Sequence, residues 1–531
     1  MVTFTRINHH PMKTIISFLL LFWLNTTGIA QITFQKVFGS SGGDYANSLL
    51  KTPDGGYLLG ANTLSFGDNF LKNYLIRLND SGDTLWTKIF HGTHWEELND
   101  MANTSDGGFI LAGRCQAPAF DYDLRMTKLN SSGDIEWISA IGGSGDEQAL
   151  SIKQTSDGGY IMAGWTNSFG SGQQDIYLIK TDQNGDVVWS KVYGGNVSDV
   201  AYAVCENETG GYTITGTMRS FLPDNDAFVM RTNEFGEILW VKVVGDAGED
   251  VFYDVAANGS GYVVTGYSNS YSNGYDLTIL NGNGDGTINW MKAYHGPGDN
   301  QGRKILPTND DGFIITGYYT VPGESADIFA LKLTATGDTS WTRTYGGVSD
   351  DRALSVVLSN DGYAFGGFEN SFGFGNGDVY LVKTDLNGDS YCDEHHRSCE
   401  IIDITSEFSD ITLDSTTGGL AYSSLFTVTH GGSIETRCSS IVHVNELNDD
   451  MSFRVFPNPV NDHDQLYFDS PICGFAVLHI SDLVGNDIYS QSTNIISGSN
   501  PILLTSSLPA GCYVFMINVG EEIHKALFIV K

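Results

Sequence analysis

Acidic side chains recur along this 531-residue chain in two sets, each with a spacing of about fifty residues. The first set comprises Asp123, Asp175, Asp226, Asp276, Asp327 and Asp378, and the second comprises Asp44, Glu96, Glu147, Asp199, Glu249 and Asp350. Carboxylate oxygens are ligands that calcium prefers, so the two sets would bind calcium or attract other cations if they met on one face. Asp side chains also cap loops by accepting backbone hydrogen bonds, which is the alternative. The cofactor therefore stays unknown, with calcium as the candidate.

Aromatic residues form another recurrent set, which comprises Phe66, Phe169, Phe221, Tyr271 and Phe372. Aromatic rings on an exposed rim can stack on sugar rings, whereas packing against a neighbouring unit is the alternative. Elsewhere His91, His94 and Glu96 stand close together. Such side chains can hold a divalent metal, but their spacing fits neither a strand nor a helix motif, and an exposed polar loop is the alternative. We take these eight residues as the candidate ligand face.

The charge balance excludes one class of partner. The chain has 63 Asp and Glu against 28 Lys and Arg, for a formal net charge of −35. Binding of nucleic acid depends on Lys and Arg that displace counterions from phosphates, so we expect no nucleic-acid partner. Hydrophobic residues make up 41% of the chain, which favours a packed core over a disordered acidic chain.

A repeat of about fifty residues must position all of these side chains. Its two clearest columns are tryptophans and turn aromatics: Trp86, Trp137, Trp189, Trp240, Trp290 and Trp341, and Tyr57, Phe109, Tyr160, Tyr212, Tyr262, Phe313 and Tyr363. Each period contains four short strand-like runs separated by glycine-containing turns. Four strands at this period indicate a β-propeller blade, and seven turn aromatics indicate seven blades. The sequence thus predicts an all-β, seven-bladed propeller over residues 31–392.

The ends of the repeat predict how the ring closes. The run that begins at Phe34 aligns with the run that begins at Trp86, while blade seven has Cys392 where a tryptophan is expected. We therefore expect the N-terminal strand to complete blade seven by pairing with residues 378–384, because closure removes exposed sheet edges. A glycine column predicts a close approach of strands: Gly113, Gly164, Gly216, Gly266, Gly317 and Gly367.

The blade pattern Asp182, Gly185 and Trp189 resembles that of bacterial extracellular propellers of the quinoprotein-like kind. The resemblance implies the fold of residues 31 to about 391. Quinoprotein enzymes have eight blades and adjacent cysteines in the cofactor site, and this chain has seven blades and no Cys-Cys pair, so no cofactor is carried over.

The N-terminus reads as a signal peptide. Residues 14–24 are an apolar run preceded by Lys13, too short to span a bilayer, and small residues precede Gln31. We expect residues 1–30 to be removed and the mature chain to have no transmembrane helix.

Residues 393–452 are rich in polar residues and predict a linker. We expect Cys392 and Cys399, at its start, to form a disulfide or to belong to the linker, and a metal site is the alternative. A different pattern starts at Phe456, Pro457, Asn458 and Pro459 and includes Gly511 and Tyr513 near the C-terminus. Residues 453–531 thereby resemble the C-terminal sorting domain of the Bacteroidetes type IX secretion system. That resemblance implies a small β-sandwich, the secretion machinery as a partner, and delivery through the periplasm to the outer cell surface or the medium.

The sequence favours a non-enzymatic binding protein, with an extracellular glycan or protein as ligand. The alternative is a hydrolase of extracellular polysaccharide that uses carboxylates on the loop face. Paired carboxylates at a separation of roughly 5 to 10 Å, one of them in an apolar pocket, would favour that alternative.

Overall fold

The computed structural model describes residues 31–442 apart from 67–69, 92–93, 117–120, 220–223, 246–247, 272–273, 321–322, 374–375, 393, 396–398, 405–408, 411–414, 417–419, 423–426 and 430–432, together with strands between 454 and 530. The predicted signal peptide lies outside the described residues, as do Pro457, Asn458 and Pro459. The chain divides into two compact units, residues 1–443 and 444–531. Within the described part every regular element is a strand, and no helix there is suited to crossing a membrane.

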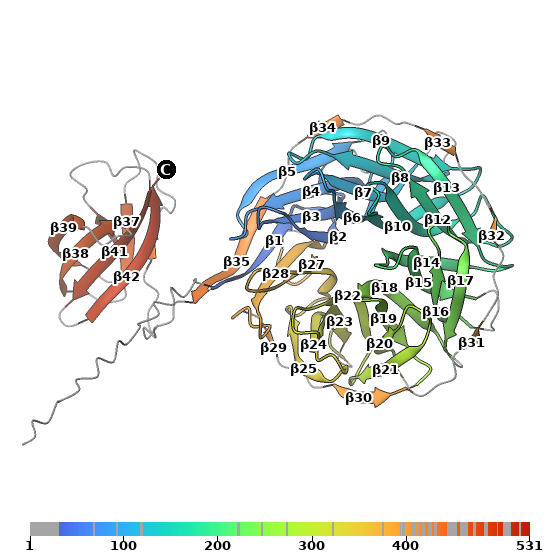
Figure 1. Cartoon of the computed structure of the whole chain (residues 1–531). Helices are drawn as coiled ribbons and strands as arrows, with labels where there is room; N and C mark the ends of the chain where they lie inside the picture. Colours follow the sequence, from blue (N-terminus) through green and yellow to red (C-terminus); the bar gives the residue numbers. More distant parts are fainter. Residues whose placement is uncertain are drawn as a thin grey trace, which may run out of the picture. The chain divides into compact units, whose positions relative to one another are not determined.

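The first unit is a ring of seven antiparallel sheets, as predicted (Figure 1). Blades 1 to 3 consist of β2 (Asp44–Lys51), β3 (Tyr57–Thr63), β4 (Lys72–Leu78) and β5 (Thr84–His91); β6 (Glu96–Asn103), β7 (Phe109–Gln116), β8 (Tyr122–Leu129) and β9 (Ile135–Gly142); and β10 (Glu147–Gln154), β11 (Tyr160–Thr166), β12 (Asp175–Thr181) and β13 (Val187–Tyr193). Blades 4 and 5 consist of β14 (Asp199–Glu206), β15 (Tyr212–Met218), β16 (Asp226–Thr232) and β17 (Ile238–Val244); and β18 (Asp250–Asn258), β19 (Gly261–Ser268), β20 (Asp276–Gly282) and β21 (Ile288–His295).

Blade 6 consists of β22 (Asn300–Pro307), β23 (Phe313–Thr320), β24 (Ala326–Leu333) and β25 (Thr339–Tyr345). Blade 7 joins both ends of the repeat, because β26 (Arg352–Leu358), β27 (Gly362–Glu369) and β28 (Asp378–Asp385) are completed by β1 (Gln31–Gly39). Phe34 pairs with Lys383 in the antiparallel register of β1 and β28, which confirms the predicted closure.

Each blade packs against the next through one repeated aromatic contact. Trp189 on the fourth strand of blade 3 lies 6.0 Å, between ring centroids, from Tyr212 of blade 4. Its ring also faces Gly236, a turn glycine of blade 4 with φ +74°, where a methyl group would meet the indole. Equivalent ring pairs are Phe34–Tyr57, Trp137–Tyr160, Trp240–Tyr262, Trp290–Phe313 and Trp341–Tyr363. Phe34 therefore takes the place of the missing seventh tryptophan.

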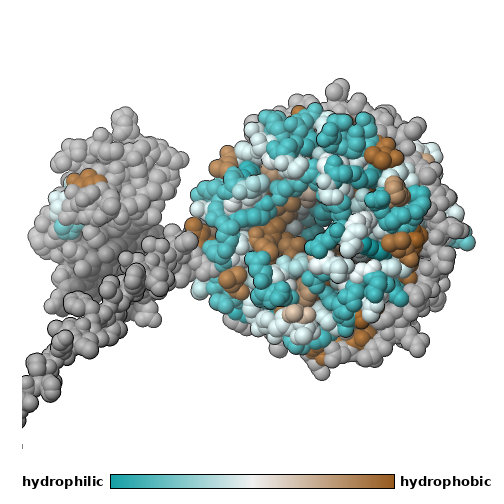
Figure 2. Space-filling view, in the orientation of Figure 1, coloured by the Kyte–Doolittle hydropathy of each residue, from teal (hydrophilic) through white to brown (hydrophobic). Residues whose placement is uncertain are grey.

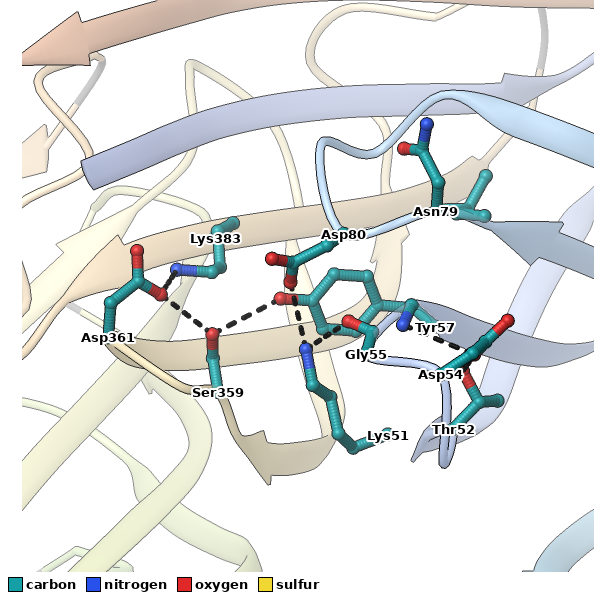
Figure 3. A network of polar contacts seen from close by, with 12 residues as sticks. Lys51, Thr52, Asp54, Gly55, Tyr57, Asn79, Asp80, Ser359, Asp361 and Lys383 are labelled. Atoms are coloured by element: carbon teal, nitrogen blue, oxygen red, sulfur yellow. Dashed lines mark hydrogen bonds and ion pairs between the residues drawn. The ribbon is translucent and has the colours of Figure 1, made fainter. Parts of the chain in front are cut away.

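Polar contacts accompany this aromatic contact at the junction of blades 7 and 1 (Figure 3). The Tyr57 hydroxyl donates a hydrogen bond to Ser359 Oγ at 3.3 Å, and Ser359 Oγ donates to Asp361 at 2.9 Å. Lys383 on β28 pairs with the same carboxylate at 2.5 Å. The turn before β3 is thereby linked to the turn before β27, so the closing junction is held by hydrogen bonds as well as by ring packing.

The described strands between Glu394 and Val442 form an outer belt around the propeller. The belt adds a fifth strand to each blade: β29 (Glu394–His395) on β25, β30 (Glu400–Asp403) on β21, β31 (Ser409–Asp410) on β17, β32 (Ser415–Thr416) on β13, β33 (Leu420–Tyr422) on β9, β34 (Thr427–Thr429) on β5 and β35 (Ser433–Val442) on β1. It therefore visits blades 6, 5, 4, 3, 2 and 1 and ends on blade 7. Figure 1 shows these short orange strands along the outer edge of the ring.

The belt corrects the expectation of a linker over residues 393–452, because the described strands between Glu394 and Val442 pair with the blades. The sequence did not reveal it since most of its strands are only two to four residues long and need no hydrophobic period. The cysteine expectation also changes: Cys392 is disulfide-bonded whereas Cys399 is a free thiol, so these two cysteines do not bridge each other.

The second unit contains two antiparallel sheets. One has the order β36 (Arg454–Phe456), β37 (Leu466–Ser470), β40 (Gly498–Ile502), and the other has the order β39 (Asp487–Ile495), β38 (Gly474–Asp482), β41 (Gly511–Val519), β42 (Glu522–Val530). Leu478 and Ile480 on β38 are buried. Phe456 ends β36, and Gly511 and Tyr513 lie on β41.

Replacing Trp189 by alanine should destabilise the propeller by about 2 to 4 kcal/mol, because a partly buried aromatic ring is exchanged for a cavity between two blades. Denaturant unfolding of the full chain gives the free energy of unfolding. Val188 is the matched control: it is the preceding residue of β13 and its side chain is 61% exposed. If Trp189→Ala and Val188→Ala had the same free energy of unfolding, the contact of Trp189 with the next blade would not contribute to stability.

Removal of the belt should destabilise the propeller more than removal of the second unit. We expect a chain that ends at residue 392 to lose roughly 5 kcal/mol relative to one that ends at residue 443, because a few ladder hydrogen bonds contribute about 1 kcal/mol each. Both chains are to be unfolded in denaturant with a reductant present, so that the Cys392 disulfide does not contribute. Equal midpoints would mean that the belt adds no stability.

Candidate ligand site at the mouth of the central channel

The first strand of every blade lines the central channel, and each of these strands contains a β-bulge. The register between first and second strands shifts at the same place in all seven blades, for example between Ala46 and Ser48 in blade 1. The residues left out of the pairing are Asn47, Asn99, Leu150, Tyr202, Tyr253, Arg303 and Leu354. Bulges re-aim side chains and bend the strand. Here they place seven side chains around one opening.

The glycine column of the second strands makes room for these bulges. A methyl group on Gly216 would collide with the carbonyl oxygen of Val200, and one on Gly317 would collide with that of Gln301. The same collision would occur at Gly113, Gly164, Gly266 and Gly367. The predicted close approach of strands is thereby confirmed, and its cause is the bulge on the neighbouring strand.

All seven bulged residues line a cavity of about 250 Å³ at one mouth of the channel. Its floor contains two ion pairs: Asp100 with Lys153 at 2.7 Å, and Asp254 with Lys304 at 2.9 Å. A second cavity, of about 290 Å³, shares Asp100, Asp254 and Lys304 with the first. Its wall also contains Leu50, Leu306 and Val357. Figure 2 shows hydrophobic residues gathered on one side of the central opening and hydrophilic residues over much of the surrounding face.

Opposite charges shift the pKa values of two groups in the floor of the cavity, Asp100 and Lys304. Burial alone would raise the pKa of Asp100, but the Lys153 and Lys304 ammonium groups and a hydrogen bond from the Ile152 N–H hold it below its ordinary value. Burial would likewise lower the pKa of Lys304, yet Asp254 and Asp100 raise it above the usual lysine range. The neighbouring opposite charges therefore favour the charged forms of Asp100 and Lys304.

Tyrosines and an arginine make up the wall of the cavity on blades 4 to 6. The Tyr202 and Tyr253 rings meet edge to face at 4.9 Å, and Tyr253 lies 5.8 Å from Tyr267. The guanidinium of Arg303 lies 3.8 Å from the centre of the Tyr253 ring, within the range of a cation–π contact. Among the described residues, Arg303 forms no ion pair with a carboxylate. The wall thus presents aromatic faces and one positive charge.

The predicted aromatic column lies elsewhere. Phe66 packs against Tyr74 at 5.5 Å, Phe169 against Tyr177 at 6.0 Å, and Phe372 against Tyr380 at 6.1 Å, in each case on the third strand of the same blade. Tyr271 is partly buried against the core cluster of blades 4 and 5. Phe221 lies outside the described residues. None of the four described rings lines the channel-mouth cavity.

Glu96 is the member of the predicted histidine and glutamate group whose side-chain partner the structure gives. Glu96 is 4% exposed and pairs with Arg125 at 2.8 Å. Burial raises the pKa of Glu96 to about 7 despite that arginine. The backbone carbonyl of His94 accepts a hydrogen bond from Lys72, and His91 ends β5 with its side chain outside the described part. These contacts place Glu96 in a buried ion pair.

The two acidic sets meet at the junctions between blades, where they cap loops. Asp199 accepts a hydrogen bond from the Gly195 N–H at 3.0 Å, and Asp351 accepts one from the Gly347 N–H at 2.7 Å. In blades 5 and 7 the capping carboxylates are Asp250, the first residue of β18, and Asp351, which directly precedes β26, so they are the neighbours of the predicted Glu249 and Asp350. In the described residues no three or more His, Cys, Asp or Glu side chains are grouped as a metal site.

Sequence reasoning missed the bulged residues, although a signal for them exists. Each lies three residues after an acidic or Asn residue at or directly before the start of its strand, as Tyr202 follows Asp199 and Arg303 follows Asn300. This column varies from blade to blade, whereas the tryptophan and glycine columns repeat. A position that varies within an otherwise regular repeat and faces a shared opening is where the blades can differ in function.

Comparison with known proteins identifies the second unit. Residues 454–531 match the family model described as "Secretion system C-terminal sorting domain". In sequence order, a type IX secretion sorting domain therefore follows a seven-bladed propeller. The sorting domain indicates export to the cell surface or the extracellular space. This confirms the sequence resemblance.

For the propeller, the comparisons found distant likenesses. The chain is 25% identical over 189 residues to the regulatory protein FlaEY of Caulobacter vibrioides, and the match spans 20% of that relative. A structure of a Dyadobacter fermentans protein of unknown function is similar with a TM-score of 0.37 and 15% identity, over 66% of this chain and 99% of that one. PorZ of Porphyromonas gingivalis, a surface component of the type IX secretion system, is similar with a TM-score of 0.19 and 11% identity, over 94% of this chain and 100% of that one.

Stability should fall as the pH rises from about 4.5 to about 7, because of Glu369 in blade 7. Its buried carboxylate accepts backbone hydrogen bonds from Phe372 and Gly373, but burial and the charges of Asp351 and Asp378 raise its pKa to about 7. Between the unfolded and folded pKa values the folded chain binds the extra proton, so its stability is greatest below that window and is lost through it.

Glu369→Gln should flatten this dependence by up to about 3 kcal/mol between pH 4.5 and pH 8. Denaturant unfolding at both pH values measures it, with Glu136→Gln as a control on an exposed carboxylate of blade 2. An unchanged pH profile in Glu369→Gln would show that this carboxyl is ionised throughout.

Proposed function

We propose that the protein is a non-enzymatic binding protein, exported by type IX secretion, whose ligand occupies the mouth of the central channel. The observation that carries the proposal is the cavity of about 250 Å³ walled by Tyr202, Tyr253 and Arg303. Pockets with aromatic walls and a few convergent polar groups are typical of ligand sites. In this proposal residues 1–30 act as the signal peptide, residues 31–443 bind the ligand, and residues 453–531 contact the secretion machinery.

The carboxylates support binding over hydrolysis. A glycosidase needs one carboxyl with a raised pKa within reach of the substrate. The two carboxylates at the cavity, Asp100 and Asp254, are each paired with a lysine, and the pKa of Asp100 is lowered. The carboxyls with raised pKa values, such as Glu96 and Glu369, are buried at blade junctions with 4% and 0% exposure. The alternative hydrolase would need a carboxyl with a raised pKa, and none is among the described residues that line the cavity.

A glycan and peptide array probed with the full-length exported protein tests the proposal, followed by product analysis on every ligand that binds. We expect binding without product, and at least about tenfold weaker binding by Tyr253→Ala, because the stacking face of the cavity is lost. Tyr122→Ala is the matched control, since Tyr122 also stacks under an arginine but lies outside the cavity. Release of shortened glycan, or equal binding by both variants, would refute the proposal.

A further inference from the structure

The cavity at the channel mouth carries a positive charge, which is unusual for a chain with a net charge of −35. Each of the two ion pairs in its floor joins one lysine to one carboxylate, so the pairs add no net charge to the cavity. Arg303 adds a third cation, and no carboxylate among the described residues pairs with it. A guanidinium without a carboxylate partner at the wall of a cavity is a ready recognition group for an anion.

The orientation of Arg303 narrows the choice of anion. Its guanidinium lies 3.8 Å from the centre of the Tyr253 ring and 5.7 Å from that of Tyr318, so it is held beside two aromatic rings. Arg352 packs over Tyr318 at 4.4 Å but pairs with Asp350 at 3.0 Å, which neutralises it. Arg303 therefore supplies a planar, pre-oriented fork of N–H donors, a geometry that matches a carboxylate.

Neighbouring groups fit a sugar ring that bears this carboxylate. Tyr202 and Tyr253 are partly exposed in the cavity, and aromatic faces pack against the C–H groups of pyranose rings. Asn47 and Asn99 donate their side-chain N–H groups to the carbonyl oxygens of Leu98 and Ala149, each at 2.7 Å. Their Oδ1 atoms remain as acceptors for hydroxyl groups.

We infer that the channel mouth binds a uronic-acid residue of an acidic polysaccharide, with the sugar carboxylate on Arg303 and the ring against the tyrosines. This rests on the proposed function and specifies its ligand class. The volume of about 250 Å³ accommodates one monosaccharide unit. The site therefore binds a single uronic-acid unit, at a chain end or a branch of the polysaccharide. An acidic peptide offers carboxylates too, but it lacks the pyranose face for the tyrosines and the hydroxyls for the asparagines.

Calorimetry on the full-length exported protein tests the inference with ligand pairs that differ only in the carboxylate: galacturonate against galactose oligomers and glucuronate against glucose oligomers. We expect at least one uronate to bind about tenfold or more tightly than its neutral counterpart, with weakening at high salt. Arg303→Gln should abolish that preference, and Arg303→Lys should restore part of it, because the charge returns without the fork.

Arg114→Gln is the matched control. Arg114 also stacks on a tyrosine, at 4.6 Å from Tyr122, but it pairs with Glu97 and lies outside the cavity, so uronate binding should be unchanged. Thermal melting of each variant verifies folding. Equal affinity for uronates and neutral sugars, binding of acidic peptides alone, or an Arg303→Gln variant with wild-type uronate affinity would overturn the inference. Neutral glycan binding that is sensitive to Tyr253→Ala would do so while leaving the proposed function intact.

Discussion

The contact between a fourth-strand aromatic ring and the turn of the next blade is the interaction on which the ring depends. An indole or phenyl ring fits there because the facing turn residue is a glycine, as Gly236 faces Trp189 and Gly82 faces Phe34. The glycine serves two purposes at once, since the turn also needs its positive φ. Each blade therefore fixes the position of the next, and seven copies of one geometry close a ring without a special joint.

Repetition explains how much of the fold could be predicted from the sequence. A side chain that must make the same contact seven times leaves a column, so the tryptophans, the turn aromatics and even the substitute Phe34 were readable. The belt leaves no column, because its strands hydrogen-bond through the backbone and β31 and β32 each have only two residues. Backbone pairing places little demand on side-chain type, and a polar segment that pairs in this way looks like a linker.

The candidate residues predicted from the sequence are not the residues that line the cavity. Phe66, Phe169 and Phe372 recur because they pack on their own blades, and recurrence is a mark of structure. Tyr253 and Arg303, which give the cavity its aromatic wall and its positive charge, belong to an inner column that varies from blade to blade. They came into view only when the bulges showed which residue of each first strand faces the opening. In a repeat protein, the residues that determine ligand specificity therefore lie at positions that do not recur, and a search for periodic residues does not find them.

The belt has a mechanical consequence. Its last strand, β35, is its longest, and it lies next along the chain to the sorting unit. Any pull transmitted through the tail, during export or while the protein is held at a surface, reaches β35 before it reaches the shorter belt strands. That strand pairs with nine residues of β1, and β1 pairs on its other side with β28. The force would therefore be shared among the many hydrogen bonds of β1 with β35 and β28. These bonds belong to blade 7, which also joins the two ends of the ring.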